Sequence, residues 1–281
     1  MSVLGVLGGS GLYELSGLEN VEEIEVETPF GVPSSPIITG QIGETKLAFV
    51  ARHGRGHNHT PSSVPYRANI YALRLLGATH VLSVSAVGSL QERLPPLTAV
   101  IPDQIIDRTT ARDRTFFDCG IVAHVGLADP YCESFRKDLF PHVASVTDRS
   151  AFGGTYVCIE GPQFSTRAES GLYRSWGAAI IGMTAMPEAR LAREAGLCYA
   201  TLAMVTDYDV WHESEGDVTV EMVQRVLARN ASTGQDVVRR LAESGLPACE
   251  RSCAKALDGA VITAPEAISD ETADRIALFR S

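Results

Sequence analysis

The sequence predicts an α/β fold, a single domain with a central mixed β-sheet flanked by helices. Short apolar segments rich in Val and Ile recur along the chain and are apolar on both faces, as in strands that are covered on both sides. Helical patterns lie between these segments, and such alternation indicates one layered α/β structure. Because no linker or change of composition interrupts the pattern, we expect one domain over residues 1–281.

The individual elements follow from their boundaries. Five strands are predicted, with turn-forming residues at their ends. These are Val3–Leu7, Leu47–Ala51, His80–Ser85, Tyr156–Ile159 and Tyr199–Val205. Three predicted helices stop at a glycine, which is a common C-terminal signal, and a fourth is long and amphipathic. The helices are Pro65–Leu76, Arg167–Trp176, Pro187–Ala195 and residues 219–243.

Charge and hydropathy narrow the classes of function. The chain has 24 Lys and Arg against 34 Asp and Glu, a formal net charge of −10. This balance argues against a nucleic-acid or anionic-membrane binder, whose surface is basic. A membrane-spanning helix needs about 18 consecutive apolar residues, and no run in the sequence approaches that length. The N-terminus does not resemble a signal peptide. We therefore expect a cytoplasmic protein, and an anionic ligand would need a local cationic pocket.

Six cysteines stand at positions 119, 132, 158, 198, 249 and 253. No pair has the C-x-x-C spacing, and no doublet of doublets indicates a zinc site. We expect buried thiols. Cys249 and Cys253 are close enough along the chain that a disulfide or a redox pair is the alternative.

Five polar segments stand out: four follow predicted strands, where ligands gather in α/β folds, and Gly182–Glu188 opens a predicted helix. Four of them combine glycine, hydroxyl or guanidinium groups that suit an anion, although each also fits an ordinary turn or helix cap. They are Gly8–Leu12, Arg52–His59, Ser83–Ser89 and Gly182–Glu188. The third follows a strand that ends near Leu82, and an anion or sugar-edge site and a strand-ending turn fit it equally well. His57 and His59 have a spacing that metal ligands use, but no carboxylate completes the set, and we expect no metal.

The fifth segment, Thr206–Trp211, contains two carboxylates, Asp207 and Asp209. Carboxylates at a strand end can accept hydrogen bonds, bind a metal or exchange a proton. Either one can also cap the turn.

Together these segments resemble the trimeric purine nucleoside phosphorylase superfamily and, within it, the 5'-methylthioadenosine phosphorylases. The similarity is colinear and covers nearly the whole chain. The matching stretches are GGSGL at 8–12, ETPFGVPS at 27–34, ARHGRGH at 51–57, PYRANIYAL at 65–73, AVGSL at 86–90, DQIIDRTT at 103–110, IEGPQFSTRAES at 159–170, GMTAMPE at 182–188, EAGLCYA at 194–200 and VTDYDVW at 205–211.

The resemblance implies a role for each matching residue. The phosphate ligands would be Ser10, Arg52, His53, Ser85, the backbone N–H of Ala86, and Thr184. The nucleoside would contact Met183 at the ribose, Phe164 at the purine ring, and Ser165, Asp207 and Asp209 at the base edge. Val220 and Val223 would line the 5' pocket, into which His124 reaches from a neighbouring subunit. The resemblance also implies a homotrimer, or a hexamer built as a dimer of trimers.

The chemistry of two positions favours adenine over a 6-oxopurine. An oxopurine offers an N1–H donor and an O6 acceptor, and adenine reverses both. Oxopurine relatives typically have Glu and Asn where this chain has Ser165 and Asp207. At the 5' end, Val220 and Val223 provide an apolar wall for a methylthio group. Gln224 is polar where some relatives are apolar, which leaves a hydroxyl or halide open.

The resulting hypothesis is phosphorolysis of 5'-methylthioadenosine to adenine and 5-methylthio-α-D-ribose 1-phosphate, an enzymatic pentosyl transfer in purine salvage. Inorganic phosphate is the co-substrate, and no cofactor is expected. Asp207 would hold the proton that the leaving adenine takes, and Asp209 would orient Asp207 or the amino group. The alternatives are an oxopurine or methylthioinosine phosphorylase, a nucleosidase that uses water, and a non-catalytic adenosine-binding protein.

Overall fold

The computed structural model describes residues 2–9, 15–212, 220–249 and 253–280. In these ranges eleven strands form one sheet. The strands are β1 (Val3–Gly8), β2 (Glu19–Ile24), β3 (Ile37–Ile42), β4 (Thr45–Ala51), β5 (His80–Ser89), β6 (Ala99–Ile101), β7 (Gln104–Asp107), β8 (Ser150–Phe152), β9 (Thr155–Cys158), β10 (Ile180–Gly182) and β11 (Cys198–Asp207). The α-helices are α1 (Tyr66–Leu75), α2 (Glu133–Ala144), α3 (Arg167–Ser175), α4 (Ala185–Glu194), α5 (Val220–Ser244) and α6 (Asp270–Arg275).

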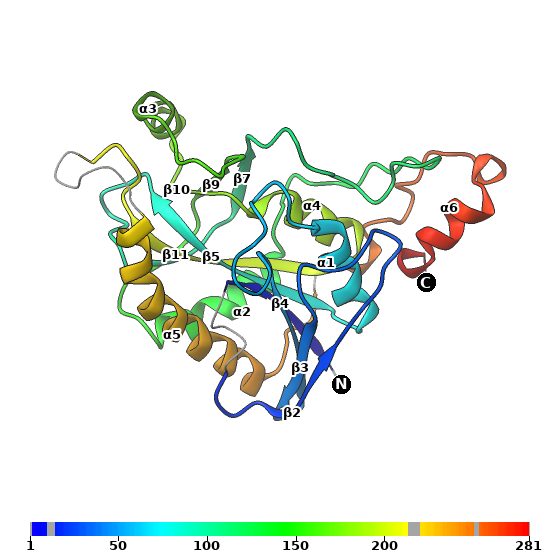
Figure 1. Ribbon diagram of the computed structural model, residues 1–281, viewed down its shortest axis with the longest axis horizontal. Coiled ribbons are helices and arrows are strands. Elements are labelled where there is room, and N and C mark those ends of the chain that lie inside the picture. The colour runs from blue at the N-terminus through cyan, green and yellow to red at the C-terminus, as the bar shows by residue number, and fades with distance from the viewer. Residues whose placement is uncertain (1, 10–14, 213–219, 250–252, 281) are drawn as a thin grey trace.

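The long strand β5 is the centre of the sheet. It pairs in parallel with β1 and β11 and, near its C-terminal end, antiparallel with β10. The sheet order is β2-β3-β4-β1-β5-β10-β9-β7, with β11, β6 and β8 branching from β5. Figure 1 shows β5 and β11 side by side in the middle of the molecule. The predicted α/β fold with a mixed central sheet is confirmed.

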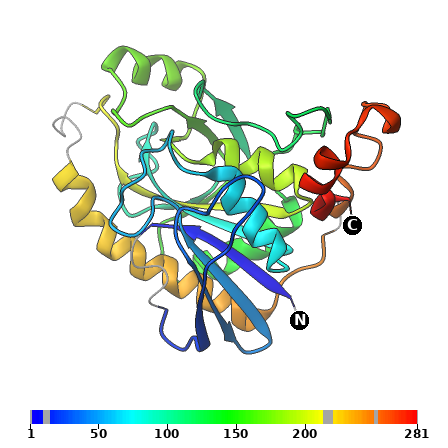
Figure 2. The same ribbon diagram turned by 45° about the vertical axis from the view of Figure 1, so that its right-hand side comes forward.

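Helices cover both faces of the sheet, as the two-sided apolar strands require. Helices α1 and α4 pack together on one face, and α2 and α5 pack on the other. Figure 2 shows α5 and α1 on opposite sides of the strands. Strand β1 divides its side chains accordingly: Leu7 belongs to the core under α1 and α4, and Leu4 and Val6 belong to the core under α2 and α5. None of the described helices is both long and apolar enough to cross a membrane.

The strand predicted at His80–Ser85 is longer than expected, and the strand-ending turn considered for Ser83–Ser89 is not formed there. Strand β5 continues through this segment to Ser89, because β11 and β10 supply pairing partners along it. Val84 and Val87 are buried on opposite faces. The serine hydroxyls therefore project from inside the sheet rather than from a loop, and their positions are fixed by strand pairing.

Helix α2 was not predicted because its sequence carries a contrary signal. Pro141 lies inside the helix, where proline removes a backbone donor and usually ends a helical pattern. Packing of Phe135 and Leu139 into the core under α5 favours the helix nevertheless.

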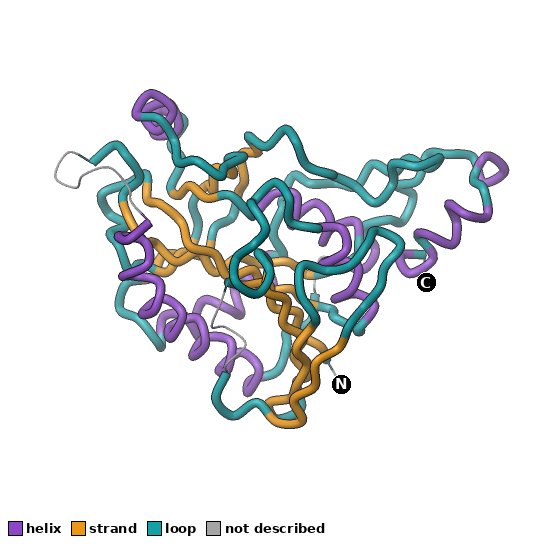
Figure 3. The backbone as a smooth tube through the Cα atoms, in the orientation of Figure 1, coloured by secondary structure: helices purple, strands orange, loops and turns teal. Residues whose placement is uncertain are grey.

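Figure 3 shows long loops above the strand ends. The segments that connect strands to helices there carry most of the predicted site residues.

Candidate active site

A cavity of about 600 Å³ lies at the C-terminal ends of β5, β10 and β11. Residues from seven separate segments of the sequence line it. The structure brings together ten of the predicted site residues at this cavity: Arg52, His53, Ser85, Ala86, Phe164, Ser165, Met183, Thr184, Asp207 and Asp209. Separate motifs of the sequence therefore meet at one cavity, and the roles assigned to their residues stay predictions.

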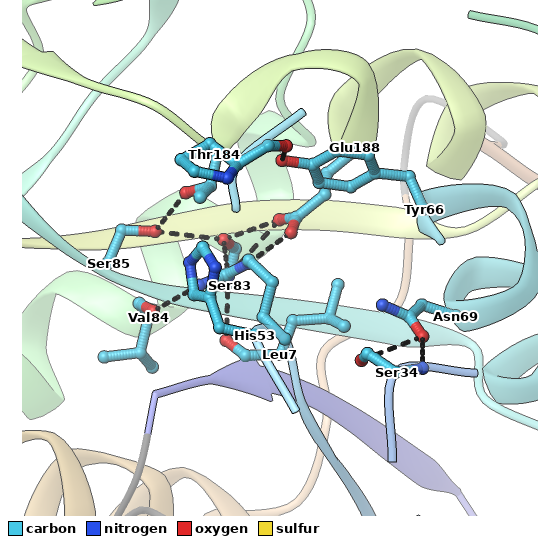
Figure 4. A network of polar contacts seen from close by, with 12 residues as sticks. Leu7, Ser34, His53, Tyr66, Asn69, Ser83, Val84, Ser85, Thr184 and Glu188 are labelled. Atoms are coloured by element: carbon cyan, nitrogen blue, oxygen red, sulfur yellow. Dashed lines mark hydrogen bonds and ion pairs between the residues drawn. The ribbon is translucent and has the colours of Figure 1, made fainter. Parts of the chain in front are cut away.

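Beneath the cavity, Arg52 forms a buried ion pair with Glu188 of α4. The Arg52 side chain is 3% exposed and the Glu188 side chain 1%. The Nε of Arg52 donates to Glu188, and its other nitrogens donate to the carbonyls of Leu7 and Val84 at 3.1 Å and to the Ser83 hydroxyl at 2.8 Å. Figure 4 shows Glu188 facing Ser83. The pair thus joins β1, β5 and α4 at one point.

The ion pair decides how much charge Arg52 offers to a ligand. Burial opposes the charge on Arg52, but the facing carboxylate of Glu188 outweighs it, so the pKa of Arg52 stays above its ordinary value. Glu188 also accepts hydrogen bonds from Ser83 and Tyr199, both at 2.9 Å. Because its guanidinium already donates hydrogen bonds to these partners, Arg52 contributes mainly its positive charge to the lining of the cavity.

His53 lies beside this pair at the cavity wall. Its Nδ1 is 2.9 Å from the carbonyl of His59, and its ring stacks on His57 at 4.4 Å between centroids. Burial, with the charge of Arg52 added, lowers the pKa of His53 to about 4. His53 is therefore neutral near pH 7, and since a carbonyl only accepts, Nδ1 carries the proton. Its Nε2 then has a lone pair that can accept a hydrogen bond.

Two hydroxyls complete this end of the cavity. Ser85 Oγ on β5 and Thr184 Oγ1 at the start of α4 are 3.1 Å apart. Figure 4 shows the two side chains pointing toward each other, near His53. Thr184 precedes α4, in which Met186 departs from helical geometry, so the helix dipole is not part of this end of the cavity. The arrangement suits a tetrahedral oxyanion that both accepts and donates hydrogen bonds.

At the other end, the end of β11 orients two carboxylates. Asp207 accepts hydrogen bonds from the Thr206 hydroxyl at 2.6 Å and from the backbone N–H of Asp209 at 2.8 Å. Asp209 has a positive φ of 54°, a left-handed conformation that is uncommon for residues other than glycine. A side chain at Gly88 would approach Asp207 Oδ1 to 3.0 Å, so the glycine leaves room for the carboxylate.

Asp209 differs from Asp207 in its environment. Its Oδ2 is buried without a hydrogen-bond partner among the described residues, as is the Oγ of Ser165. Burial, together with the neighbouring charge of Asp207, raises the pKa of Asp209 to about 6. A carboxyl group with such a pKa keeps a proton in part of the molecules near neutral pH. This end of the cavity therefore presents two polar groups to a ligand, the Oδ2 of Asp209 and the Oγ of Ser165.

Arg112 forms hydrogen bonds to two separate loops that line the cavity. It donates to the backbone carbonyl of Met183 at 2.7 Å, to that of Glu160 at 2.7 Å, and to the Glu160 carboxylate at 2.9 Å. Met183 leads into α4, and Glu160 precedes the loop with Phe164 and Ser165. A single buried guanidinium therefore sets the spacing between these loops.

Four predicted residues are not seen at the cavity. Ser10 lies outside the described residues, as do the side chains of Val220 and Val223 in the first turns of α5. His124 is exposed, and its backbone pairs with Ala260 at 2.9 Å instead of lining the cavity of its own chain.

Sequence reasoning missed Glu188 and Arg112 as positioning residues. A signal for Glu188 was present: it interrupts an otherwise apolar helix face that includes Ala185, Ala189 and Ala192, all buried. A charged residue on such a face requires a buried partner. Nothing local to Arg112 identifies its partners, which come from loops far along the chain.

Comparison with known sequences places these features in a family. Residues 3–243 match the family model described as the phosphorylase superfamily. The chain is 49% identical over 278 residues to S-methyl-5'-thioadenosine phosphorylase of Geobacter sulfurreducens, covering 99% of this chain and 97% of the relative. It is 50% identical over 283 residues to the protein of that name from Koribacter versatilis, covering 98% and 94%.

Solved structures agree. A methylthioadenosine phosphorylase sourced from an antarctic soil metagenomic library has a TM-score of 0.92 at 49% identity, covering 99% of this chain and 98% of that one. Methylthioadenosine phosphorylase from Schistosoma mansoni in complex with adenine has a TM-score of 0.82 at 36% identity, covering 87% and 91%. The similarity therefore includes the strands and loops that form the cavity.

The Glu188→Gln variant tests the buried ion pair. Gln keeps the shape of the side chain but leaves the Arg52 charge uncompensated, so we expect a loss of about 3–5 kcal/mol in the free energy of unfolding. Urea unfolding measures it. Glu194→Gln is the matched control, since Glu194 is buried on the same helix but is bound by the Phe116 N–H and the Thr115 hydroxyl. Equal losses in both variants would contradict the account.

Proposed function

The chain belongs to the phosphorylase superfamily, and we propose that it catalyses phosphorolysis of 5'-methylthioadenosine to adenine and 5-methylthio-α-D-ribose 1-phosphate. One observation carries this assignment. A single cavity of about 600 Å³ has an oxyanion site at Ser85 and Thr184 and a pair of carboxylates at Asp207 and Asp209. Phosphorolysis needs both, on opposite sides of a nucleoside.

The phosphate end would hold the nucleophile. Cleavage of the N-glycosidic bond builds positive charge on the ribose, and a phosphate held beside C1' stabilises that charge and attacks it. Ser85, Thr184 and the Ala86 N–H would bind its oxygens. The lone pair on Nε2 of neutral His53 would accept a hydrogen bond from a protonated phosphate oxygen. Arg52 would supply positive potential from below.

The purine end would neutralise the leaving base. Negative charge develops on the purine as the bond breaks, and a carboxylic acid near N7 can supply the proton. We assign contact with N7 and the 6-amino group to Asp207. Asp209 orients Asp207 through its N–H, and its raised pKa lets it hold the proton that Asp207 then delivers to N7.

The unpartnered groups at the base end support adenine as the base. The 6-amino group of adenine has two N–H donors, so it can reach the buried Oδ2 of Asp209 as well as Asp207, and N1 is an acceptor that suits the Ser165 hydroxyl. A 6-oxopurine would face carboxylate oxygens with its own O6, which leaves buried acceptors unpaired. Phe164 would pack on the ring and Met183 on the ribose.

The remaining assignments rest on the resemblance and the open side of the cavity. We propose a cytoplasmic homotrimer in which His124 reaches the 5' pocket of a neighbouring subunit. The 42% exposure of Phe164 at the cavity and the 48% exposure of Leu172 on α3 suit a surface that a second copy covers. Val220 and Val223 would contact the methylthio group. We assign no metal or cofactor to this reaction.

The proposal predicts adenine release that requires phosphate and is fastest with 5'-methylthioadenosine. Initial rates with and without phosphate would be compared for this nucleoside, adenosine and methylthioinosine, with adenine and hypoxanthine separated by chromatography. Equal release without phosphate would indicate a nucleosidase, and preference for methylthioinosine would overturn the assignment of Ser165 and Asp207. Binding of adenosine with no turnover would indicate a binding protein.

Replacing the two carboxylates separates their roles. We expect Asp207→Asn to lower turnover of the adenine nucleoside by about tenfold to a thousandfold, because the amide cannot transfer a proton. Wild-type kcat/KM should decline as the pH rises through the pKa of Asp209, about 6 in the free enzyme, because the protonated form is lost. Asp209→Asn should lower the rate and remove this decline.

The control for the pH profile is Glu194→Gln. Burial raises the pKa of Glu194 to about 7, close to that of Asp209, but Glu194 does not line the cavity. This variant should keep the decline. A decline that persists in Asp209→Asn and disappears in Glu194→Gln would contradict the assigned proton source.

A further inference from the structure

Four of the six cysteines converge on one point of the fold, although they are far apart in the sequence. Cys132 precedes α2, Cys198 begins β11, and Cys249 and Cys253 follow α5. Their four Sγ atoms all lie within 4.8 Å of one another. Cys132, Cys198 and Cys253 are buried, and Cys249 is partly buried. Each sulfur comes from a different turn or element and faces a common centre.

We propose that these four cysteines bind one zinc ion as a structural tetrathiolate site. Zinc with four sulfur ligands is tetrahedral, with bonds of about 2.3 Å, which places the sulfur atoms about 3.8 Å apart. The distance between the sulfurs of Cys132 and Cys249 is 3.9 Å. A disulfide needs about 2.05 Å between sulfurs, and all six cysteines are free thiols in the structure. The spacing therefore fits a metal ion better than a covalent pair.

The surroundings of the sulfurs favour negative charge. Cys132 occupies the N-cap position of the 12-residue helix α2, where the helix dipole stabilises an anion. The backbone N–H of Cys253 donates to Cys249 Sγ at 3.1 Å. The Arg193 guanidinium approaches Cys253 Sγ to 3.9 Å. Such donors offset the negative charge that four thiolates keep after binding a divalent ion.

Zinc binding at this cluster needs no oxidant or reductant. It forms four Zn–S bonds and releases the thiol protons to solvent, with no change of oxidation state.

The site is remote from the cavity and closed to substrate. Cys198 is the first residue of β11 and Asp207 the last, so the cluster and the carboxylates lie at opposite ends of one strand. Four protein ligands leave no open position on a tetrahedral ion, which is typical of structural zinc. The ion would hold Cys249 and Cys253, which follow α5, against the start of α2 and the start of β11. This inference does not depend on the proposed reaction.

The sequence predicted no metal because only part of the pattern is local. Cys249 and Cys253 are separated by three residues, a spacing that occurs in zinc sites, but no second doublet follows. Cys132 and Cys198 supply the other two sulfurs through tertiary structure. Local spacing therefore identifies only half of the ligand set.

Zinc content and thiol reactivity test the proposal on the full-length protein purified under reducing conditions. After incubation with zinc and removal of excess, elemental analysis should give about one zinc per chain. Cys198→Ser and Cys253→Ser should lose most of it. Cys119→Ser is the matched control, because Cys119 is exposed and outside the cluster. It should retain full zinc content, and Co²⁺-loaded wild type should show the thiolate charge-transfer and visible bands of tetrahedral cobalt.

Two results would overturn the proposal. One is a wild-type protein without stoichiometric zinc whose four cluster thiols all react after unfolding. The other is a pair of disulfides among these cysteines, detected by mass spectrometry of the non-reduced, alkylated protein. Melting temperature gives a readout independent of activity. Zinc removal should lower it in wild type and in Cys119→Ser, and should have no effect in Cys198→Ser.

Discussion

The buried ion pair between Arg52 and Glu188 is the interaction on which the rest of the site depends. It joins the end of β4 to α4, and its hydrogen bonds extend to β1, β5 and β11 through Leu7, Ser83 and Tyr199. A charge buried without a partner is costly, so each member requires the other. The elements that line the cavity are thereby fixed relative to one another.

This pair also explains how an acidic protein can receive an anion. A chain with a net charge of −10 repels phosphate at long range, but charges farther apart than about 8 Å are largely screened in physiological salt. Local donors therefore decide binding. Because Glu188 offsets the charge of Arg52, hydroxyl and N–H groups of Ser85, Thr184 and Ala86 would make the direct contacts. Phosphate would be held by directed hydrogen bonds on a rigid strand rather than by an excess of positive charge.

The sequence was sufficient for the fold class and for the segments that converge, for reasons visible in particular elements. Strand β11 is mostly apolar up to Val205, and α5 is a long amphipathic pattern, so local rules identify both. The continuation of β5 past Leu82 needed the pairing partners β10 and β11, which no local pattern reveals. Pairs such as Arg52 and Glu188, 136 positions apart, and the four-cysteine cluster exist only once the chain is folded. The assigned roles of the site residues, including His124, Val220 and Val223, stay predictions.

A crystal structure of the enzyme with phosphate and an unreactive 5'-methylthioadenosine analogue tests the central claim most directly. The account predicts phosphate between the hydroxyls of Ser85 and Thr184, the adenine edge on Asp207 and Asp209, and an unbroken bond between Arg52 and Glu188. Phosphate bound away from these hydroxyls would contradict the account. An Arg52 side chain that has left Glu188 and binds phosphate directly would contradict it as well.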